Sequence, residues 1–318
     1  MLVNYEVPYL YNPLFSFLYF SMEIAMINRA IVFRSALSLV VYLALAAGTV
    51  VAQDPPRTEL GIRLAENHGD GAFYRLEEVK LRQTPAYPAG TLYALKTSDA
   101  AYRTYIAGLR AVEEEAGVTT MLLNDVLGRT LPGRPEDWPF KAYCEWDVVV
   151  LKHYPNWRAW EMVEGSAAQH AAVVHRGAAV ANEQIVITPA PEVPPTPRQV
   201  TNNDPTDRVF YMVNLIQLRE EAFYPSGEFP GSTGREAYAR YQGGGELSTT
   251  DRVRFVSVEV PDALNPTGVS WWRMNIVQYP SLREFMEIEL TPEFRHIWRH
   301  KDAGLSPICS PATVPTLP

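Results

Sequence analysis

The chain of 318 residues carries the same succession of sequence signals twice, and this internal repeat restricts its fold more than any other feature. Three segments of the first half recur in the second half in the same order. Their first residues are Phe73 and Phe210, Ala101 and Ala237, and Trp146 and Trp271. From Trp146 onward the halves align without a gap, so that Glu164 corresponds to Glu289 and His175 to His300. The pattern predicts one structural module that is present twice.

A proline-rich segment separates the two copies. Residues 188–205 contain six prolines and few apolar side chains. Because proline lacks a backbone N–H and favours extended backbone, this composition is typical of a linker. We therefore predict a first module over residues 53–187 and a second module over residues 206–318, joined by this linker.

Each copy is predicted to follow the order β-α-β-β-α-β, which is that of a ferredoxin-like split unit. The predicted strands cover residues 72–81, 118–127, 143–152 and 183–188 in the first copy, and 208–218, 252–260, 271–279 and 308–314 in the second. The predicted helices cover residues 99–116 and 156–180 in the first copy, and 234–242 and 281–300 in the second. Ser98 or Asp99 is expected to cap the first helix and Ser281 the last.

A sheet of this kind has helices on one face only, so its other face must be covered. Two modules that pack with their bare faces together meet this need. We predict an α+β fold in which two ferredoxin-like modules form an intramolecular pseudo-dimeric α/β barrel. A monomer would then suffice to complete the barrel.

Several short runs in the second copy resemble a known family. The runs cover residues 211–215, 232–241, 277–285, 292–294 and 300–305. Together they resemble an uncharacterised family of dimeric α/β-barrel (ferredoxin-like) domains, over most of residues 208–310 and more faintly over 72–188. The resemblance implies the fold but leaves the function open, because the wider superfamily includes cofactor-free monooxygenases, lactone isomerases and haem-binding enzymes. Family members usually carry an arginine after the histidine of the second helix; Arg176 fits this pattern, whereas Lys301 departs from it.

Strand alternation sorts the candidate binding residues, since successive side chains of a strand point to opposite faces. We predict that one polar set faces into the barrel, where aromatic walls with a few polar groups are typical of a small-molecule pocket. The predicted ligand-binding residues are Asn214, Arg273, Asn275, Trp271, Arg75 and Glu77. The alternative is that Arg75, Glu77 and Arg273 form ion pairs at the rim or between the modules.

The candidate catalytic residues are His300, His175, Arg273 and Asn275. The two histidines are equivalent positions near the end of the second predicted helix, where each could act as a general acid or base near neutral pH. The alternative is a structural role, in which each histidine packs, donates a hydrogen bond or interacts with the helix C-terminus. No spacing of the His-Glu-x-x-His kind occurs, so the sequence predicts no metal site and no cofactor.

The favoured hypothesis is a protein that binds a small, partly apolar molecule or serves as a scaffold. The alternatives are a cofactor-independent enzyme of the monooxygenase or isomerase type, acting inside the barrel, and a haem-binding protein. Nucleic acid is an unfavourable partner, because the net charge is −8 and the chain has no long basic run. The two cysteines, Cys144 and Cys309, are too few for a disulfide-rich scaffold, although they could pair in an oxidising compartment.

The amino terminus, residues 1–52, has the pattern of a secretory signal segment. A basic start around Arg29 precedes residues 35–52, which are 18 uncharged residues that end in small side chains. We predict a leader that begins at Met22 or Met26, and a secreted or periplasmic protein without stable membrane insertion after cleavage. The alternative is a membrane anchor formed by the same segment, since its length is just enough to cross a bilayer.

Overall fold

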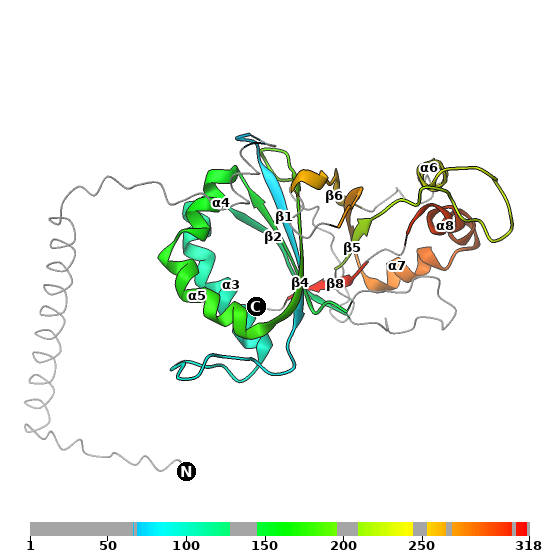
Figure 1. Cartoon of the computed structure of the whole chain (residues 1–318). Helices are drawn as coiled ribbons and strands as arrows, with labels where there is room; N and C mark the ends of the chain where they lie inside the picture. Colours follow the sequence, from blue (N-terminus) through cyan, green and yellow to red (C-terminus); the bar gives the residue numbers. More distant parts are fainter. Residues whose placement is uncertain are drawn as a thin grey trace, which may run out of the picture. The chain divides into compact units, whose positions relative to one another are not determined.

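The computed structural model describes residue 66 and residues 69–127, 145–195, 209–243, 253–264, 269–306 and 310–316 (Figure 1). All of them belong to one unit, Pro55–Pro318, which contains a sheet of eight strands. The predicted leader, Cys144 and Cys309 lie outside the described residues. No helix in the described part of the chain combines the length and the apolar composition that crossing a bilayer requires.

The order of helices and strands predicted from the sequence is confirmed in both halves. The first half consists of β1 (Phe73–Leu81), α3 (Ser98–Glu115), β2 (Thr119–Val126), β3 (Val148–Tyr154), α4 (Trp157–Glu164), α5 (Ala167–Ala179) and β4 (Val180–Pro189). The second half consists of β5 (Phe210–Ile216), α6 (Gly234–Gly243), β6 (Val253–Glu259), the short 3-10 helix η2 (Asp262–Leu264), β7 (Arg273–Tyr279), α7 (Leu282–Glu289), α8 (Pro292–Gly304) and β8 (Ala312–Pro315). Strand β4 includes the first two residues of the predicted linker.

The strands are arranged in the order β4-β1-β3-β2-β8-β5-β7-β6, and each neighbouring pair is antiparallel. Each half therefore has the ferredoxin-like strand order. Strand β2 pairs with β8 and joins the halves into one sheet. At the two free ends of the sheet, the Thr188 hydroxyl on β4 donates a hydrogen bond to the Glu259 carbonyl oxygen on β6. The fold is thus an α+β pseudo-dimeric barrel of two ferredoxin-like halves, as predicted.

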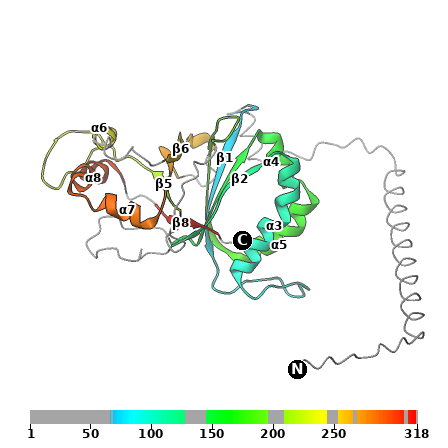
Figure 2. The same cartoon turned by 180° about the vertical axis from the view of Figure 1, so that it is seen from behind.

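The helices of each half cover one face of their own strands, as the two opposite views show (Figures 1 and 2). The second helix predicted in each half is in fact two helices, α4 with α5 and α7 with α8. In the first half the break occurs at Gly165 and Ser166, and the Ser166 side chain caps α5 by accepting the Gln169 N–H. In the second half Thr291 caps α8, and Pro292 occupies its first turn, where proline is favoured. A cap in the middle of each predicted helix therefore divides it.

The capping residues are only partly those predicted. Ser281 caps α7 and accepts a backbone N–H at 3.0 Å, as expected. The cap of α3 is Thr97, whose side chain accepts a backbone N–H at 3.1 Å, so the assignment to Ser98 or Asp99 was wrong. Asp99 instead lies in the first turn of α3, where its carboxylate interacts favourably with the positive end of the helix dipole.

The strand faces turned away from the helices pack into one apolar core that the two halves share. Its buried residues are Tyr74, Leu76, Leu122, Val149, Leu151 and Val186 from the first half and Tyr211, Val213, Leu215, Val256, Val260, Trp271, Met274 and Ile276 from the second. On the opposite strand faces, separate clusters pack strand residues against the helices of the same half, and Leu264 of η2 joins one cluster of the first half. Apolar side chains therefore form the core of the barrel interior, and buried polar residues such as Glu78 and Asn124 lie on the same strand faces.

This arrangement corrects the predicted orientation of the polar side chains. Arg75, Glu77, Asn214 and Asn275 lie on the helix-covered faces, because each alternates along its strand with residues of the shared core such as Leu76. Alternation separates the two faces of a strand but does not reveal which of them meets the helices. On this side Arg75 and Glu77 pair with each other and Arg176 of α5 lies 4.0 Å from Glu77, so the burial of their charges beneath the helices is compensated.

Two glycines allow α6 and α8 to approach closely. A Cβ on Gly234 would lie 2.3 Å from the Arg219 carbonyl oxygen and 2.5 Å from the Gly304 carbonyl oxygen. A Cβ on Gly304 would lie 3.0 Å from the backbone nitrogen of Tyr238. Because a larger residue does not fit at this crossing, the two glycines place residues of both helices around one cavity.

Candidate functional site

A cavity of about 50 Å³ lies between strands β5 and β7 and the helices α6, α7 and α8 that cover them. Aromatic rings form much of its wall and belong to Tyr238, Tyr241, Tyr279, Phe285 and Trp298. The polar and charged residues of the lining are Asn214, Asn275, Glu289 and Lys301. Met212, Ile216 and Val277 complete the lining. Aromatic walls with a few convergent polar groups are typical of sites that bind small molecules.

Hydrogen bonds hold the two asparagine amides in place. The Asn275 amide donates to the Tyr238 hydroxyl at 3.2 Å and accepts from the Ser257 hydroxyl at 2.6 Å. The Asn214 amide accepts from the Ser310 hydroxyl at 2.9 Å and donates to the Asn275 backbone carbonyl at 3.4 Å. Because both ends of each amide are anchored, a ligand would meet a preorganised polar surface.

Two charged residues of the lining, Glu289 and Lys301, are buried, although side chains of this kind are rarely so. Their exposed fractions are 6% and 7%. The Lys301 Nζ atom lies 4.1 Å from the ring centroid of Trp298 and 5.6 Å from that of Tyr241. Contacts of this kind between an ammonium group and aromatic rings are attractive. The cavity therefore has both an anionic and a cationic side chain in its wall.

Only part of the predicted ligand-binding set is brought together at this cavity. Asn214 and Asn275 line it. Trp271 belongs to the shared apolar core instead. Arg273, at the start of β7, lies 3.4 Å from a Glu259 carboxylate oxygen and forms an ion pair there. Neither of these last two predicted residues is part of the cavity lining.

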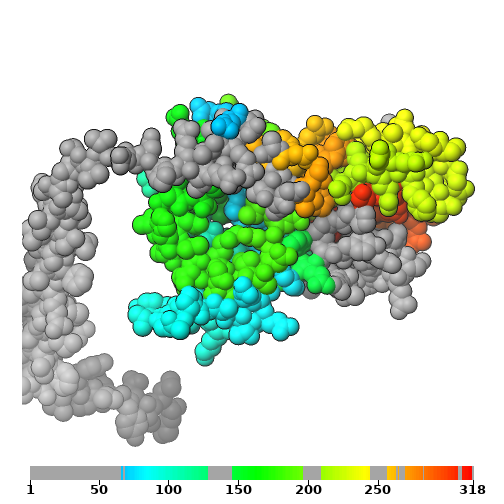
Figure 3. Space-filling view, in the orientation of Figure 1, coloured from blue at the N-terminus to red at the C-terminus, as the bar shows by residue number. Residues whose placement is uncertain are grey.

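The two candidate catalytic histidines lie outside the cavity lining, and each is bonded to a tyrosine from the loop after the first strand of its half. The Tyr87 hydroxyl lies 2.7 Å from His175 Nδ1, and the Tyr224 hydroxyl lies 2.8 Å from His300 Nδ1. The loop that contains Tyr87 projects from the surface (cyan, lower edge of Figure 3). Burial, together with neighbouring cations, lowers the pKa of His300. The repeated tyrosine–histidine pair favours a structural role in which each histidine holds its loop against the helix.

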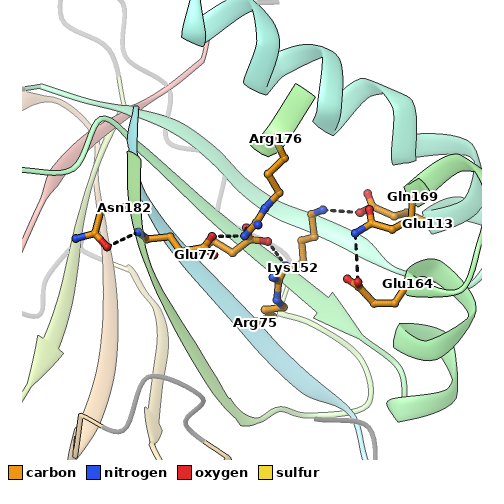
Figure 4. A network of polar contacts seen from close by, with 9 residues as sticks. Arg75, Glu77, Glu113, Lys152, Glu164, Gln169, Arg176 and Asn182 are labelled. Atoms are coloured by element: carbon orange, nitrogen blue, oxygen red, sulfur yellow. Dashed lines mark hydrogen bonds and ion pairs between the residues drawn. The ribbon is translucent and has the colours of Figure 1, made fainter. Parts of the chain in front are cut away.

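At the corresponding place in the first half, charged side chains occupy the space between the strands and the helices (Figure 4). Arg75 and Glu77 form a buried ion pair. Arg176 on α5 is bonded to Glu183 and lies 4.0 Å from a Glu77 carboxylate oxygen. Burial acts to lower the pKa of Arg75, but the Glu77 carboxylate raises it above the ordinary value. Arg75 and Glu77 are thus paired within the first half and not between the two halves.

A second buried ion pair, between Lys152 on β3 and Glu113 on α3, belongs to the same region. Its side chains are only 1% and 6% exposed. Burial acts to raise the pKa of Glu77, but Arg75, Lys152 and Arg176 lower it below the ordinary value. Glu77 is therefore ionised, and its charge stabilises the cations around it.

Sequence reasoning missed Glu289 and Lys301, although the repeat contained a signal for both. Glu289 ends α7 as Glu164 ends α4, and the two correspond in the gap-free alignment of the halves. Lys301 directly follows His300, as Arg176 follows its equivalent histidine. Charged residues that recur at matching places on helices packed against a sheet are candidates for buried functional positions.

The cavity does not fit a haem. Sites that enclose ligands of drug size have volumes of roughly 300–1,000 Å³, whereas this cavity has about 50 Å³. Neither of the two candidate histidines belongs to the cavity lining. Over the described residues, no group of three or more His, Cys, Asp or Glu side chains is placed to hold a metal ion. The haem alternative therefore has no support from this site.

Comparison with known proteins gives no family. No family model matches the chain, and no curated protein matches it. Among similar solved structures, a protein of unknown function from Rhodopseudomonas palustris is 25% identical over 43% of this chain and 95% of its own, with a TM-score of 0.33. A haem-binding protein from Thermus thermophilus is 13% identical over 77% of this chain and 92% of its own, with a TM-score of 0.39. A chlorite dismutase variant from Candidatus Nitrospira defluvii is 9% identical over 77% of this chain and 92% of its own, with a TM-score of 0.39. Scores this low assign neither a family nor an activity, so the function must be argued from the site itself.

Proposed function

We propose that the protein binds a small molecule in the cavity of its second half. The observation that carries this proposal is the composition of the cavity wall, which combines five aromatic rings with two oriented amides, a carboxylate and an ammonium group. A lining with few, well-placed polar groups among aromatic rings recognises ligands by shape and by orientation. The barrel interior, which the sequence favoured for this role, holds the apolar core that the two halves share.

A scaffold role alone explains the cavity less well. Even a buried charged side chain that has a partner often contributes no more stability than a well-packed apolar residue of similar volume. A protein that needed only stability would gain by filling this space with apolar residues, as the shared core does. Glu289 and Lys301, both buried at the wall of one cavity, are therefore better explained by recognition of a ligand.

The proposal predicts that small polar or aromatic probes bind next to Trp298. The indole N–H of Trp298 donates to Asp302 at 2.9 Å, so its NMR signal reports on the cavity wall. We expect at least one of four probes (phenol, benzoate, methylguanidinium and guanidinoacetate) to shift this signal and the Asn275 side-chain amide signals in a saturable way. The indole signal of Trp160, which lies in the first half, is the internal control and should not move.

A result in which none of the four probes shifts the Trp298 and Asn275 signals at millimolar concentration would contradict the proposal and favour a scaffold role.

Cofactor-independent catalysis is a second candidate, because a buried carboxylate and a buried ammonium beside one ligand are placed for proton transfer. The same spectra test this candidate. Probe signals that change into product signals over hours would support it, and probe signals that stay constant would speak against it.

We also propose that the protein is exported with the help of its amino-terminal segment. The support is the sequence pattern of a basic start, an uncharged stretch and small residues before Gln53. Amino-terminal sequencing of the protein isolated from its native cells should find Gln53 as the first residue. A membrane-bound protein that retains residues 35–52 would show instead that the segment is an anchor, and a mature chain beginning near Met1 would contradict both.

A further inference from the structure

The loop between β1 and α3, residues 82–97, presents two adjacent large apolar side chains to solvent. Leu92 is 88% exposed and Tyr93 is 80% exposed, the highest fractions among the large apolar side chains that the structure describes. The loop projects from the body of the protein (cyan, Figures 1 and 3). Because removal of apolar side chains from water is favourable, a second surface that covers both residues would be bound through them.

The tip of this loop is held in place from both sides. At its base, the backbone N–H groups of Arg82 and Ala86 donate hydrogen bonds to carbonyl oxygens at the end of α5, at 2.8 and 2.9 Å. Tyr87 and Leu95, which flank the tip, pack against the buried cluster that joins α3 and α5 to the sheet. A partner surface would therefore meet a loop that is already ordered, which lowers the entropic cost of binding.

The charges of the loop are all positive. Arg82 and Lys96 lie on either side of the tip, and residues 82–97 contain no aspartate or glutamate. Both side chains are exposed, and neither forms an ion pair with a residue that the structure describes. Since the whole chain has a net charge of −8, this loop is a local exception. A cationic loop attracts an anionic surface.

The corresponding loop of the second half has the opposite charge. Residues 217–233, between β5 and α6, contain one arginine and three glutamates. Phe223 in this loop is 63% exposed, and Tyr224 is bonded to His300 as Tyr87 is to His175. The two loops thus share their attachment and an exposed apolar side chain, but not their charge. The acidic loop is therefore a control within the same protein.

We infer that the loop of residues 82–97 attaches the protein reversibly to an anionic lipid surface. Leu92 and Tyr93 would lie at the boundary between headgroups and acyl chains, where an apolar side chain and an amphipathic ring are both favoured. Arg82 and Lys96 would face the headgroup phosphates. A protein partner fits less well, because leucine and lysine are depleted among the residues that dominate protein interfaces. This inference does not depend on the cavity of the second half.

The first test measures binding of the whole protein to lipid vesicles by co-sedimentation. We expect binding to mixed phosphatidylglycerol and phosphatidylcholine vesicles to be about fivefold tighter than to phosphatidylcholine alone. The double variant Leu92→Ser with Tyr93→Ser should bind the mixed vesicles about tenfold more weakly, because it loses the apolar contacts. Arg82→Gln with Lys96→Gln should lose the preference for the mixed vesicles. Phe223→Ser, in the acidic loop, is the matched control and should bind as the wild type does.

A second test reports on the loop itself, since residues 35–52 could also hold the chain on a vesicle. Tyr93→Trp adds an indole at the tip, and lipids brominated along their acyl chains quench an indole that reaches them. We expect brominated mixed vesicles to quench the emission that this variant has in addition to the wild type. The emission that Phe223→Trp adds to the other loop should not be quenched.

Absence of quenching in Tyr93→Trp would overturn the inference, whatever the co-sedimentation shows. Sedimentation velocity without lipid tests a second copy of the chain as the occupant. A dimer that Leu92→Ser with Tyr93→Ser converts into a monomer would show that the tip is covered by a second copy, and would overturn the lipid inference. Both results would leave the proposed small-molecule cavity untouched.

Discussion

Replacing Arg75 by methionine should lower the free energy of unfolding by about 3–5 kcal/mol, because it leaves a buried carboxylate without its partner. The side chains of Arg75 and Glu77 are only 8% and 0% exposed, so water cannot solvate the remaining charge. Chemical denaturation at pH 7 measures the loss. Arg176, which lies 4.0 Å from Glu77, compensates only part of it.

The informative comparison is the double variant Arg75→Met with Glu77→Asn. It gives β1 the residue types that β5 has at the corresponding positions, Met212 and Asn214. Because both charges are removed together, it should recover most of the stability that Arg75→Met loses. A buried ion pair often contributes little over a neutral pair of similar volume, whereas one of its members alone is costly. Equal losses in the single and double variants would show that the packing of Arg75, and not its charge, stabilises the first half.

Glu78→Gln should increase stability at alkaline pH and flatten the dependence of stability on pH. Burial raises the pKa of Glu78 from 4.5 to about 8. Since the folded protein holds this proton more tightly than the unfolded chain, the stability that it contributes is complete below pH 4.5 and is lost as the pH rises through 8. Each unit of such a shift corresponds to about 1.4 kcal/mol, so the variant should exceed the wild type by on the order of 4 kcal/mol at pH 9.

Urea denaturation at pH 5, 7 and 9 checks this expectation, and the neighbouring residue gives the control. Glu77 lies on the other face of the same strand, and the nearby cations Arg75, Lys152 and Arg176 lower its pKa against the effect of burial. The stability that its ionised form contributes is present above pH 4.5 and is lost at lower pH, so Glu77→Gln should destabilise the protein at pH 7. Parallel pH profiles for the two variants would contradict the assignment of these carboxylates to different faces.

The order of helices and strands was predictable because it depends on local signals that occur in both halves. Alternating apolar residues mark the strands, and the residue before a helix shows where it begins, as Ser281 does for α7. The division of each second helix was missed, because Ser166 and Thr291 lie within patterns that continue to look helical on both sides. A serine or threonine side chain can bond to a nearby backbone N–H and begin a new helix, or it can stay inside one continuous helix. Which of the two occurs depends on the contacts that the segment makes in the folded chain.

The candidate site was predictable only as a set of residue types. Asn214 and Asn275 were correctly grouped on one face of neighbouring strands, and they do line one cavity. The position of that face under the helices was not predictable, because the polar residues could equally have faced the barrel. Glu289 and Lys301 were missed as lining residues, since they come from helices whose packing against the sheet is a long-range property.

By itself, the sequence determined that two stretches share one pattern, and hence the order of the elements and the residues that share a strand face. Only the tertiary structure decided that this face meets the helices, and that one half fills its polar site while the other encloses a cavity. The physical reason is that alternation and capping act between near neighbours along the chain, whereas burial is set by distant residues in close packing. The difference between Arg75 and Met212, or between Glu77 and Asn214, becomes a cavity only when helices and strands meet.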